Sequence, residues 1–160
     1  MAEAAQQPPQ TAPSGAQPGV FIDPYRAYNF KLVIQGVVEG HFTECSGMGI
    51  KVEALEYREG GQNQVVHRIP GRVEYSSVTL RYGLTPSRAL WDWFMAGVKG
   101  GVQRKNVSIL MLDSQGITEV MRWDLINAWA TEWRGAALDA MHGEMAVETL
   151  VLVFETLERA

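Results

Sequence analysis

Alternation of apolar and polar residues predicts strands from the first residues of the folded part. Phe30, Leu32 and Ile34 share one face while Lys31 lies on the other, which is the period of a half-buried strand. The run from Leu150 to Phe154 is apolar at every position, so this strand is expected to be buried on both faces. Turn residues between such segments predict strands over 28–34, 38–44, 50–58, 63–69, 75–82, 106–112, 117–129 and 146–154.

Apolar residues at the spacing of a helix predict one main helix between the fifth and sixth strands. Thr85 is expected to cap it and Pro86 to occupy its first position. It is expected to end near Lys99, before Gly100 and Gly101. Its predicted buried stripe is Leu90, Trp91, Phe94, Met95 and Val98. Residues 133–143 are expected to be an irregular or short helical connection.

Seven or eight strands and one helix predict a mainly β protein, a small antiparallel β-barrel or sandwich. The alternation places aliphatic and aromatic side chains in its core. Trp93 and Trp133 are assigned either to the core or to an interface. The predicted core is Phe30, Leu32, Ile34, Leu80, Leu90, Trp91, Phe94, Trp123, Leu125, Trp129, Leu150, Leu152 and Phe154.

A long hairpin is predicted over residues 50–69, with a tip at Gly60 and Gly61. Charged residues are frequent in both of its arms, so the hairpin gains little by packing on its own core. Pro70 and Gly71 are expected to form the turn that closes it. We therefore expect a projecting polar hairpin that pairs with another molecule. A bend is predicted at 46–49, before the hairpin.

Composition limits the kind of protein that this chain can be, but it does not identify a function. The 160 residues include 46% hydrophobic and 20% charged residues, with a formal charge of −4, and no basic patch indicates nucleic-acid binding. Residues 1–20 form an Ala/Gln/Pro-rich segment expected to be a flexible arm, and residues 21–160 the β domain. Cys45 is expected to be a small buried residue. Neither a signal peptide nor a membrane span is recognisable, which predicts synthesis in the cytoplasm.

Candidate chemistry is sparse. His41, His67 and His142 lie in separate elements without metal-ligand spacing. Glu53 and Glu56 point to opposite faces of a strand, so they do not converge as a catalytic pair. The turn at Ser46 lacks the Gly-x-Ser-x-Gly pattern of a hydrolase. No catalytic, cofactor or metal site is predicted, and the chain is not expected to be an enzyme.

An ordered series of short motifs resembles the tail-tube proteins of contractile phages and of related extracellular injection particles. The resemblance covers about residues 23–157. The matching pieces are Asp23-Pro24-Tyr25, Tyr28-Asn29-Phe30, Phe42-Thr43-Glu44-Cys45-Ser46-Gly47-Met48, Glu56-Tyr57-Arg58-Glu59-Gly60-Gly61 followed by Asn63, Arg68-Ile69-Pro70-Gly71, Val78-Thr79-Leu80-Arg81-Tyr82-Gly83, Leu90-Trp91-Asp92-Trp93, Trp123-Asp124-Leu125-Ile126-Asn127-Ala128-Trp129 and Ala146-Val147-Glu148-Thr149-Leu150. The sequence departs from the family in having Ala130 where proline is frequent, and in its last strand.

The resemblance implies hexameric rings that stack into a hollow inner tube inside a contractile sheath. Strands of neighbouring subunits are expected to join into one lumen-lining barrel. The implied partners are copies of the chain, the sheath protein, baseplate or tube-initiator proteins, a tail terminator, and cargo or DNA in the lumen. The expected location is a phage tail or a contractile injection particle. The predicted subunit contacts are Ser46, Gly47, Met48, Glu56, Tyr57, Arg58, Glu59, Gly60, Gly61, Asn63, Arg68, Pro70 and Gly71.

Three alternatives stay open. A tube-initiator or terminal paralogue at the baseplate shares the same pattern. A hexameric ring protein of a type VI secretion system shares the same fold. A small β-barrel ligand carrier or enzyme belongs to another class and needs a convergent polar pocket, for which the sequence offers no residues.

Overall fold

A computed structural model of the protein describes residues 29–35, 42–61 and 64–160. The expected arm over 1–20, the domain start at 21, the first half of the second strand, and Gln62 and Asn63 lie outside these ranges. The described elements are nine strands and one helix. They are β1 (Phe30–Ile34), β2 (Phe42–Ser46), β3 (Ile50–Tyr57), β4 (His67–Tyr75), β5 (Val78–Gly83), α1 (Ala89–Val98), β6 (Lys105–Leu112), β7 (Glu119–Arg134), β8 (Val147–Val153) and β9 (Thr156–Arg159).

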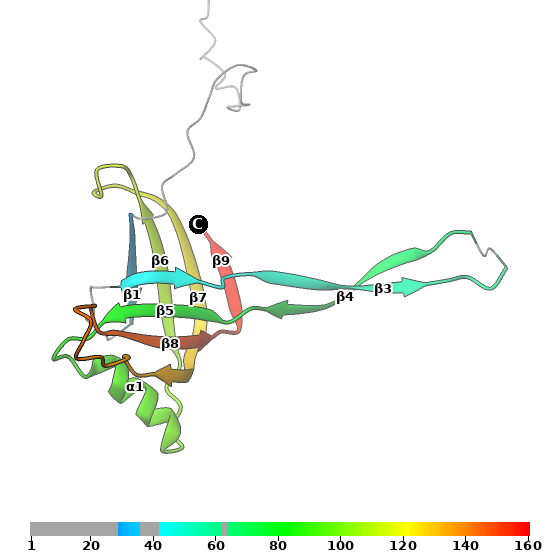
Figure 1. Cartoon of the computed structure of the whole chain (residues 1–160). Coiled ribbons are helices and arrows are strands. Elements are labelled where there is room, and N and C mark those ends of the chain that lie inside the picture. Colours follow the sequence, from blue (N-terminus) through cyan, green and yellow to red (C-terminus); the bar gives the residue numbers. More distant parts are fainter. Residues whose placement is uncertain (1–28, 36–41, 62–63) are drawn as a thin grey trace, which may run out of the picture.

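Seven antiparallel strands form one folded sheet in the order β1-β6-β7-β8-β5-β2, with β9 paired to β7. The layer of β1, β6, β9 and the first part of β7 runs across the layer of β8, β5 and β2 (Figure 1). The long strand β7 joins the two layers, because it pairs with β6 and β9 first and with β8 from Trp129 onward. β1 and β2 end the strand order, so pairing within the described chain does not close a barrel. The expected mainly β fold is confirmed, in its sandwich form.

The core lies between the two layers, with α1 beside β7. Leu80, Leu125, Leu150 and Leu152 have no exposed surface. Other predicted core residues contribute at its edge, since Phe30, Phe94 and Trp123 are partly buried against it. The buried cluster is Leu32, Ile34, Val78, Leu80, Tyr82, Leu90, Trp93, Val107, Ile109, Leu125, Ala128, Leu150, Leu152 and Phe154.

The alternation of inward and outward side chains along β7 is interrupted at Asn127, whose backbone φ is +54°. The side-chain Oδ1 of Asn106 accepts the Asn127 backbone N–H at 3.2 Å. Between the pairs Lys105–Ala128 and Val107–Leu125, β7 contains one residue more than β6. Leu125 and Ala128 are therefore both buried although they are three residues apart. The alternation that put Trp129 on the face of Leu125 therefore fails, and Trp129 is only partly buried.

The helix starts later than the sequence predicted. The backbone N–H of Leu84 donates to the Ala146 carbonyl at 2.9 Å, so the chain is still tied to the sheet as it reaches Thr85. Residues 85–88 then span the distance to the helix. The N-cap position is Arg88, which makes no side-chain cap, and the expected cap at Thr85 is wrong.

The buried face of α1 also differs from the predicted stripe. Leu90 and Trp93, three residues apart, are its buried residues, and the indole N–H of Trp93 donates to the Gln103 carbonyl at 2.7 Å. Trp91 is partly buried, with its ring 4.7 Å from that of Trp133 in a T-shaped arrangement. Val98 is 62% exposed. Trp93 belongs to the core because its one polar atom finds a partner in the loop after the helix.

Two boundaries near the ends of strands were misplaced. The strand expected over 75–82 begins only at Val78 as β5, because Tyr75 ends β4 and Ser76 and Ser77 lie opposite the bend that follows β2. Trp133 and Arg134 belong to β7 rather than to the connection. The short strand β9, which pairs with β7, was not predicted.

Candidate assembly surfaces

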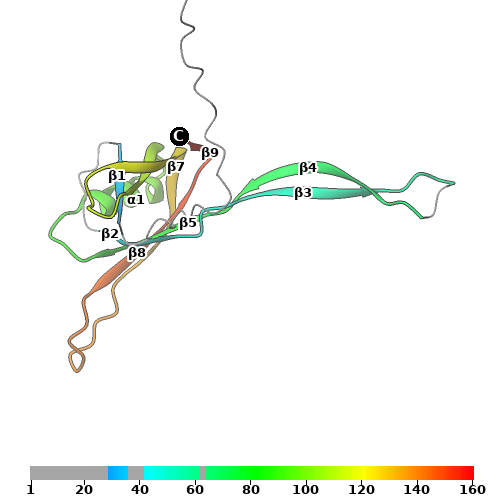
Figure 2. The ribbon, with the colours of Figure 1, turned by 90° about the horizontal axis from the view of Figure 1, so that it is seen from above.

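The hairpin of β3 and β4 extends away from the sandwich as a two-stranded ribbon (Figures 1 and 2). The β3–β4 ladder follows directly on the ladder of β2 with β5. Between the two ladders, the backbone N–H of Ser76 donates to the Gly49 carbonyl at 2.9 Å. Every residue of β3 is exposed. The ribbon makes no pairing with the seven-stranded sheet among the described residues. Its position leaves both of its faces accessible.

Several predicted contact residues lie together on this ribbon. Glu56 is opposite Arg68, with 3.8 Å between the Oε1 and Nε atoms, and Tyr57 is opposite His67. Arg58, Glu59, Gly60 and Gly61 follow at the far end and are exposed. The φ of Gly61 is +136°, a value that favours glycine. Asn63 lies outside the described residues.

The predicted turn at Pro70 and Gly71 is wrong, because both residues lie within β4. The pairs Val52–Val73 and Ala54–Pro70 enclose one extra residue on β4, which is a β-bulge. A bulge on a two-stranded ribbon tolerates proline, since the ladder is interrupted there. The ribbon is therefore longer than predicted and reaches Tyr75.

Sequence reasoning missed the apolar side chains of the hairpin. Half of the sixteen large hydrophobic residues that are exposed in the described chain lie between residues 50 and 73. The available signal was apolar residues at alternate positions among the charged ones. The eight residues are Ile50, Val52, Leu55, Tyr57, Val65, Val66, Ile69 and Val73.

The bend between β2 and β3 is anchored in the sandwich rather than free. Gly47 has a φ of +86°, and a Cβ atom there would stand 2.6 Å from the Ser77 carbonyl oxygen. Met48 is partly buried against the core. Ser46 ends β2 and its hydroxyl donates to Glu44 at 3.1 Å. These predicted contact residues thus fix the base of the hairpin within its own chain.

The outer face of the layer β2, β5, β8 and the end of β7 has charged side chains on β2, β5 and β7 and partly buried valines on β8. Arg81 pairs with Glu44 at 3.2 Å, and Arg134 pairs with Glu132 at 2.5 Å. Hydrogen bonding to Glu132 raises the pKa of Arg134 above its usual range. None of the large exposed hydrophobic residues of the described chain lies on these four strands. The charged side chains of these two ion pairs are about half exposed or more.

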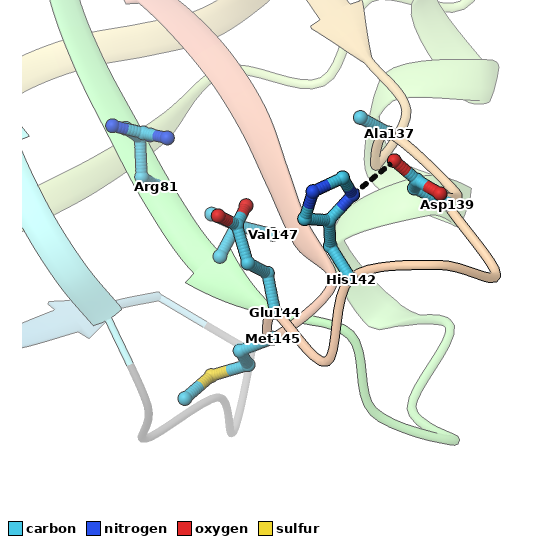
Figure 3. A pocket seen from close by; sticks show the side chains of 7 residues that line it. All are labelled: Arg81, Ala137, Asp139, His142, Glu144, Met145 and Val147. Carbon is cyan, nitrogen blue, oxygen red and sulfur yellow. Dashed lines mark hydrogen bonds and ion pairs between the residues drawn. The ribbon is translucent and has the colours of Figure 1, made fainter.

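The connection between β7 and β8 forms an open polar pocket of about 550 Å³ with Arg81 (Figure 3). In this pocket, His142 Nδ1 lies 2.7 Å from Asp139 Oδ2. The Met141 backbone N–H, and then His142, lower the pKa of Asp139. Both side chains of the pair are more than half exposed. The described residues that line this pocket include no Ser, Thr or Cys beside the His–Asp pair.

Cys45 lines a mainly apolar pocket of about 320 Å³ beside Met48 and Trp123. Burial, and then the charge of Glu44, raise the pKa of Cys45 to about 11. The thiol is therefore protonated at neutral pH and is a poor nucleophile. Among residues 29–35, 42–61 and 64–160, no group of three acidic, His or Cys side chains is arranged to hold a metal ion. No helix in the same ranges has the length and apolarity to span a membrane.

The family model of the T4-like virus tail tube protein gp19 matches residues 26–158. The chain belongs to this tail tube family. The expectation of a contractile tail-tube protein is confirmed, and the family and its fold relatives are structural tube proteins.

Solved structures agree with the family model. A chain from the sheath-tube complex of an extracellular contractile injection system, PVC, in the extended state is 27% identical, with a TM-score of 0.76 and coverage of 86% of this chain and 91% of that one. A chain from the PVC sheath/tube terminator is 26% identical, with a TM-score of 0.79 and coverage of 88% and 99%.

More distant structures share only the fold of this tail tube protein. Hcp1 from Flavobacterium johnsoniae is 10% identical, with a TM-score of 0.53 and coverage of 83% of this chain and 95% of that one. A search of curated proteins finds no significant match.

Proposed function

We propose that this tail tube protein forms hexameric rings that stack into the inner tube of a contractile phage tail or injection particle, as a conduit for cargo or DNA. The hairpin is the observation that carries the proposal. It exposes eight large apolar side chains that its own sandwich does not cover, and copies of the chain in a stack would bury them. A sheath protein, a baseplate or initiator and a terminator are the further proposed partners.

The outer face of β2, β5 and β8, which has paired charges on β2 and β5, is the proposed wall of the conduit. A conduit wall stays in contact with water after assembly, whereas contact surfaces become buried. The paired charges of Arg81 and Glu44 and the lack of large exposed apolar side chains on these described strands support this assignment. The edges of β1 and β2 that have no partner strand among the described residues would pair with neighbouring copies, which removes exposed strand edges.

The proposed role needs no catalysis. The protonated thiol of Cys45 and the open setting of the His142–Asp139 pair support a subunit that works through assembly and rigidity. Recombinant rings or tubes that turn over a substrate at either residue would contradict this part of the proposal.

Assembly of the full-length chain, alone and with its proposed baseplate partners, tests the proposal. Sedimentation velocity and negative-stain electron microscopy are expected to show rings or hollow tubes. Ile69→Ser removes an apolar side chain from the hairpin and is expected to weaken assembly. Ile117→Ser is the matched control, because Ile117 is 82% exposed but lies outside the hairpin. Chains that stay monomeric under every condition would contradict the proposed function.

A terminal position in the tube is the second candidate. The likeness to a chain of the PVC sheath/tube terminator structure is as strong as the likeness to the sheath-tube complex. Copy number in purified particles separates the two positions. Hundreds of copies per particle support the main tube, and a single ring supports the terminal position.

A further inference from the structure

The apolar pocket beside Cys45 opens where strand pairing leaves the sandwich unclosed. The strands β1 and β2 end the strand order of the described residues, and Phe30 of β1 and Cys45 of β2 line the same pocket of about 320 Å³. Met48 and Trp123 line it as well. All four side chains pack against the core, yet each is only partly buried. An apolar occupant would complete their burial.

The polar groups at this pocket already have partners within the chain. Two polar residues, Thr43 and Glu44, are part of its lining. The Thr43 hydroxyl donates to the Arg81 carbonyl at 3.1 Å. Glu44 Oε2 accepts from Arg81 Nη1 at 3.2 Å, and Glu44 Oε1 accepts from the Ser46 hydroxyl at 3.1 Å. Because these groups are bonded, the pocket selects an occupant chiefly by its apolar surface.

The described part of the chain begins beside the pocket. The Asn29 carbonyl accepts the Leu112 backbone N–H at 2.9 Å. The next residue, Phe30, lies opposite Met111, and both line the pocket. Residues 20–28 join the chain at this point, and a segment of that length spans up to about 30 Å when extended. Its side chains are therefore within reach of the pocket.

Residues 20–28 contain apolar side chains of the kind that the pocket would bury. Val20-Phe21-Ile22 is a run of three large apolar residues, whereas residues 2–19 contain no Val, Leu, Ile, Met, Phe, Tyr or Trp. Asp23-Pro24 follows the run, and this pair favours a turn, which would let the run fold back over the chain. The tail tube family model matches only from residue 26, so the run is a feature of this chain that the family model does not include.

We propose that Val20-Phe21-Ile22 binds in the pocket of its own chain and completes the apolar core between β1 and β2. The segment is attached next to the pocket, and a short tether gives an effective concentration in the millimolar range. A segment of another copy has no such advantage in dilute solution. The proposal concerns one subunit and does not rest on the proposed function. Binding would also fix the place at which residues 1–19 leave the sandwich.

Alkylation of Cys45 tests the proposal, because it is the one cysteine of the chain and lines the pocket. The rate of reaction with iodoacetamide is measured on the full-length chain at a concentration where sedimentation shows monomers. Phe21→Ser/Ile22→Ser is expected to raise the rate at least about tenfold, since loss of two apolar side chains shifts the binding equilibrium by more than that factor. Deletion of residues 2–19 is the matched control and is expected to leave the rate unchanged.

The folded state of each variant is checked by circular dichroism and urea unfolding, so that faster alkylation is attributed to the pocket only in a folded chain. A folded double variant that reacts at the rate of the unsubstituted chain would overturn the proposal. Faster reaction after deletion of residues 2–19, equal to that of the double variant, would also overturn it, because the covering segment would then lie outside the apolar run.

Disulfide formation gives a second measurement that leaves Phe21 and Ile22 in place. Val20→Cys is expected to form a bond with Cys45 within one chain, seen as a faster-migrating monomer on a non-reducing gel. Ala12→Cys is the control. Bond formation by Val20→Cys is expected to be more than tenfold faster than by Ala12→Cys, whereas a freely moving arm would give only about threefold from the difference in chain length.

The products of this reaction also distinguish the possible occupants of the pocket. Cross-linked dimers from Val20→Cys in place of cross-linked monomers would assign the pocket to another copy and overturn the proposal. A rate ratio no larger than about threefold would mean that the segment visits the pocket without binding, which overturns it as well. Neither result changes the expectation that the chain forms rings and tubes.

Discussion

The sandwich and the hairpin are built from the same antiparallel pairing, yet they bury side chains to opposite extents. Leu80, Leu125 and Leu150 in the sandwich have no exposed surface. In β3 of the hairpin every residue is exposed, including Leu55 at 48%. Each hairpin strand has one paired neighbour, whereas β5, β6, β7 and β8 of the sandwich each have at least two. The two regions also differ in what covers their side chains.

The comparison shows which region is stable by itself. A two-stranded ribbon is marginally stable in water unless another layer covers it. The sandwich has two layers and a helix, and the ribbon has neither. The sandwich accordingly accounts for the stability of the monomer, and the hairpin contributes chiefly once a partner covers its apolar residues.

The largest expected effect comes from truncating matched aliphatic residues in the two regions. Leu150→Ala is expected to lower the free energy of unfolding by about 3 kcal/mol, because it removes a fully buried side chain and leaves a cavity. Ile69→Ala in the hairpin is expected to change it by less than about 0.5 kcal/mol, since Ile69 is 48% exposed. Urea unfolding of both monomers measures the difference. Equal losses would show that the monomer itself covers the hairpin.

A smaller effect is expected from glycines at the base and the tip of the hairpin. Gly47→Ala should cost about 2 kcal/mol, because φ is +86° and the new methyl group would meet the Ser77 carbonyl at 2.6 Å. Gly60→Ala is the control, as no other atom lies within 4 Å of its Cβ position. Thermal unfolding compares the two variants. A stable Gly47→Ala monomer would mean that the base of the hairpin adjusts freely.

The sequence was sufficient to predict the sandwich wherever the alternation was regular. Leu32 and Ile34 in β1 and Leu80 in β5 follow a period of two and are buried. In β8, Leu150 and Leu152 are buried but Val151 and Val153 only partly, so the expectation of a strand buried on both faces is wrong. Regular alternation works there because each strand has one face on the core. The hairpin tip at Gly60 was likewise predicted from turn chemistry.

Prediction failed where the backbone departs from a regular period. The positive φ of Asn127 reversed the face of Trp129, and the bulge at Gly71 put a Pro-Gly pair inside a strand. Trp93 was ambiguous because the hydrogen bond of its indole to Gln103 depends on a loop brought close by the fold. The apolar patches of the hairpin were obscured by the charged residues between them.

The smallest expected effect compares two ion pairs, one in each region. In the sandwich, Asp124 accepts from the Ser108 hydroxyl at 2.5 Å and from Arg122 Nε at 2.9 Å. The Ser108 hydrogen bond, and then Arg122, lower the pKa of Asp124 below its ordinary 3.8. In the hairpin, Arg68 and Glu56 are 3.8 Å apart and both largely exposed. The sandwich pair should stabilise the monomer more, because exposed pairs with loose geometry contribute little.

The pH dependence of unfolding measures this difference. Because the folded state lowers the pKa of Asp124, its contribution is present above the unfolded value and is lost as pH falls through the lowered folded value. Asp124→Asn is thus expected to cost about 1 kcal/mol at pH 7 and progressively less below about pH 4. Glu56→Gln is expected to leave the free energy of unfolding at pH 7 unchanged, because both side chains of its ion pair are largely exposed. A cost for Asp124→Asn that does not shrink in acid would assign its effect to packing rather than to charge, and the sandwich would then differ from the hairpin in burial alone.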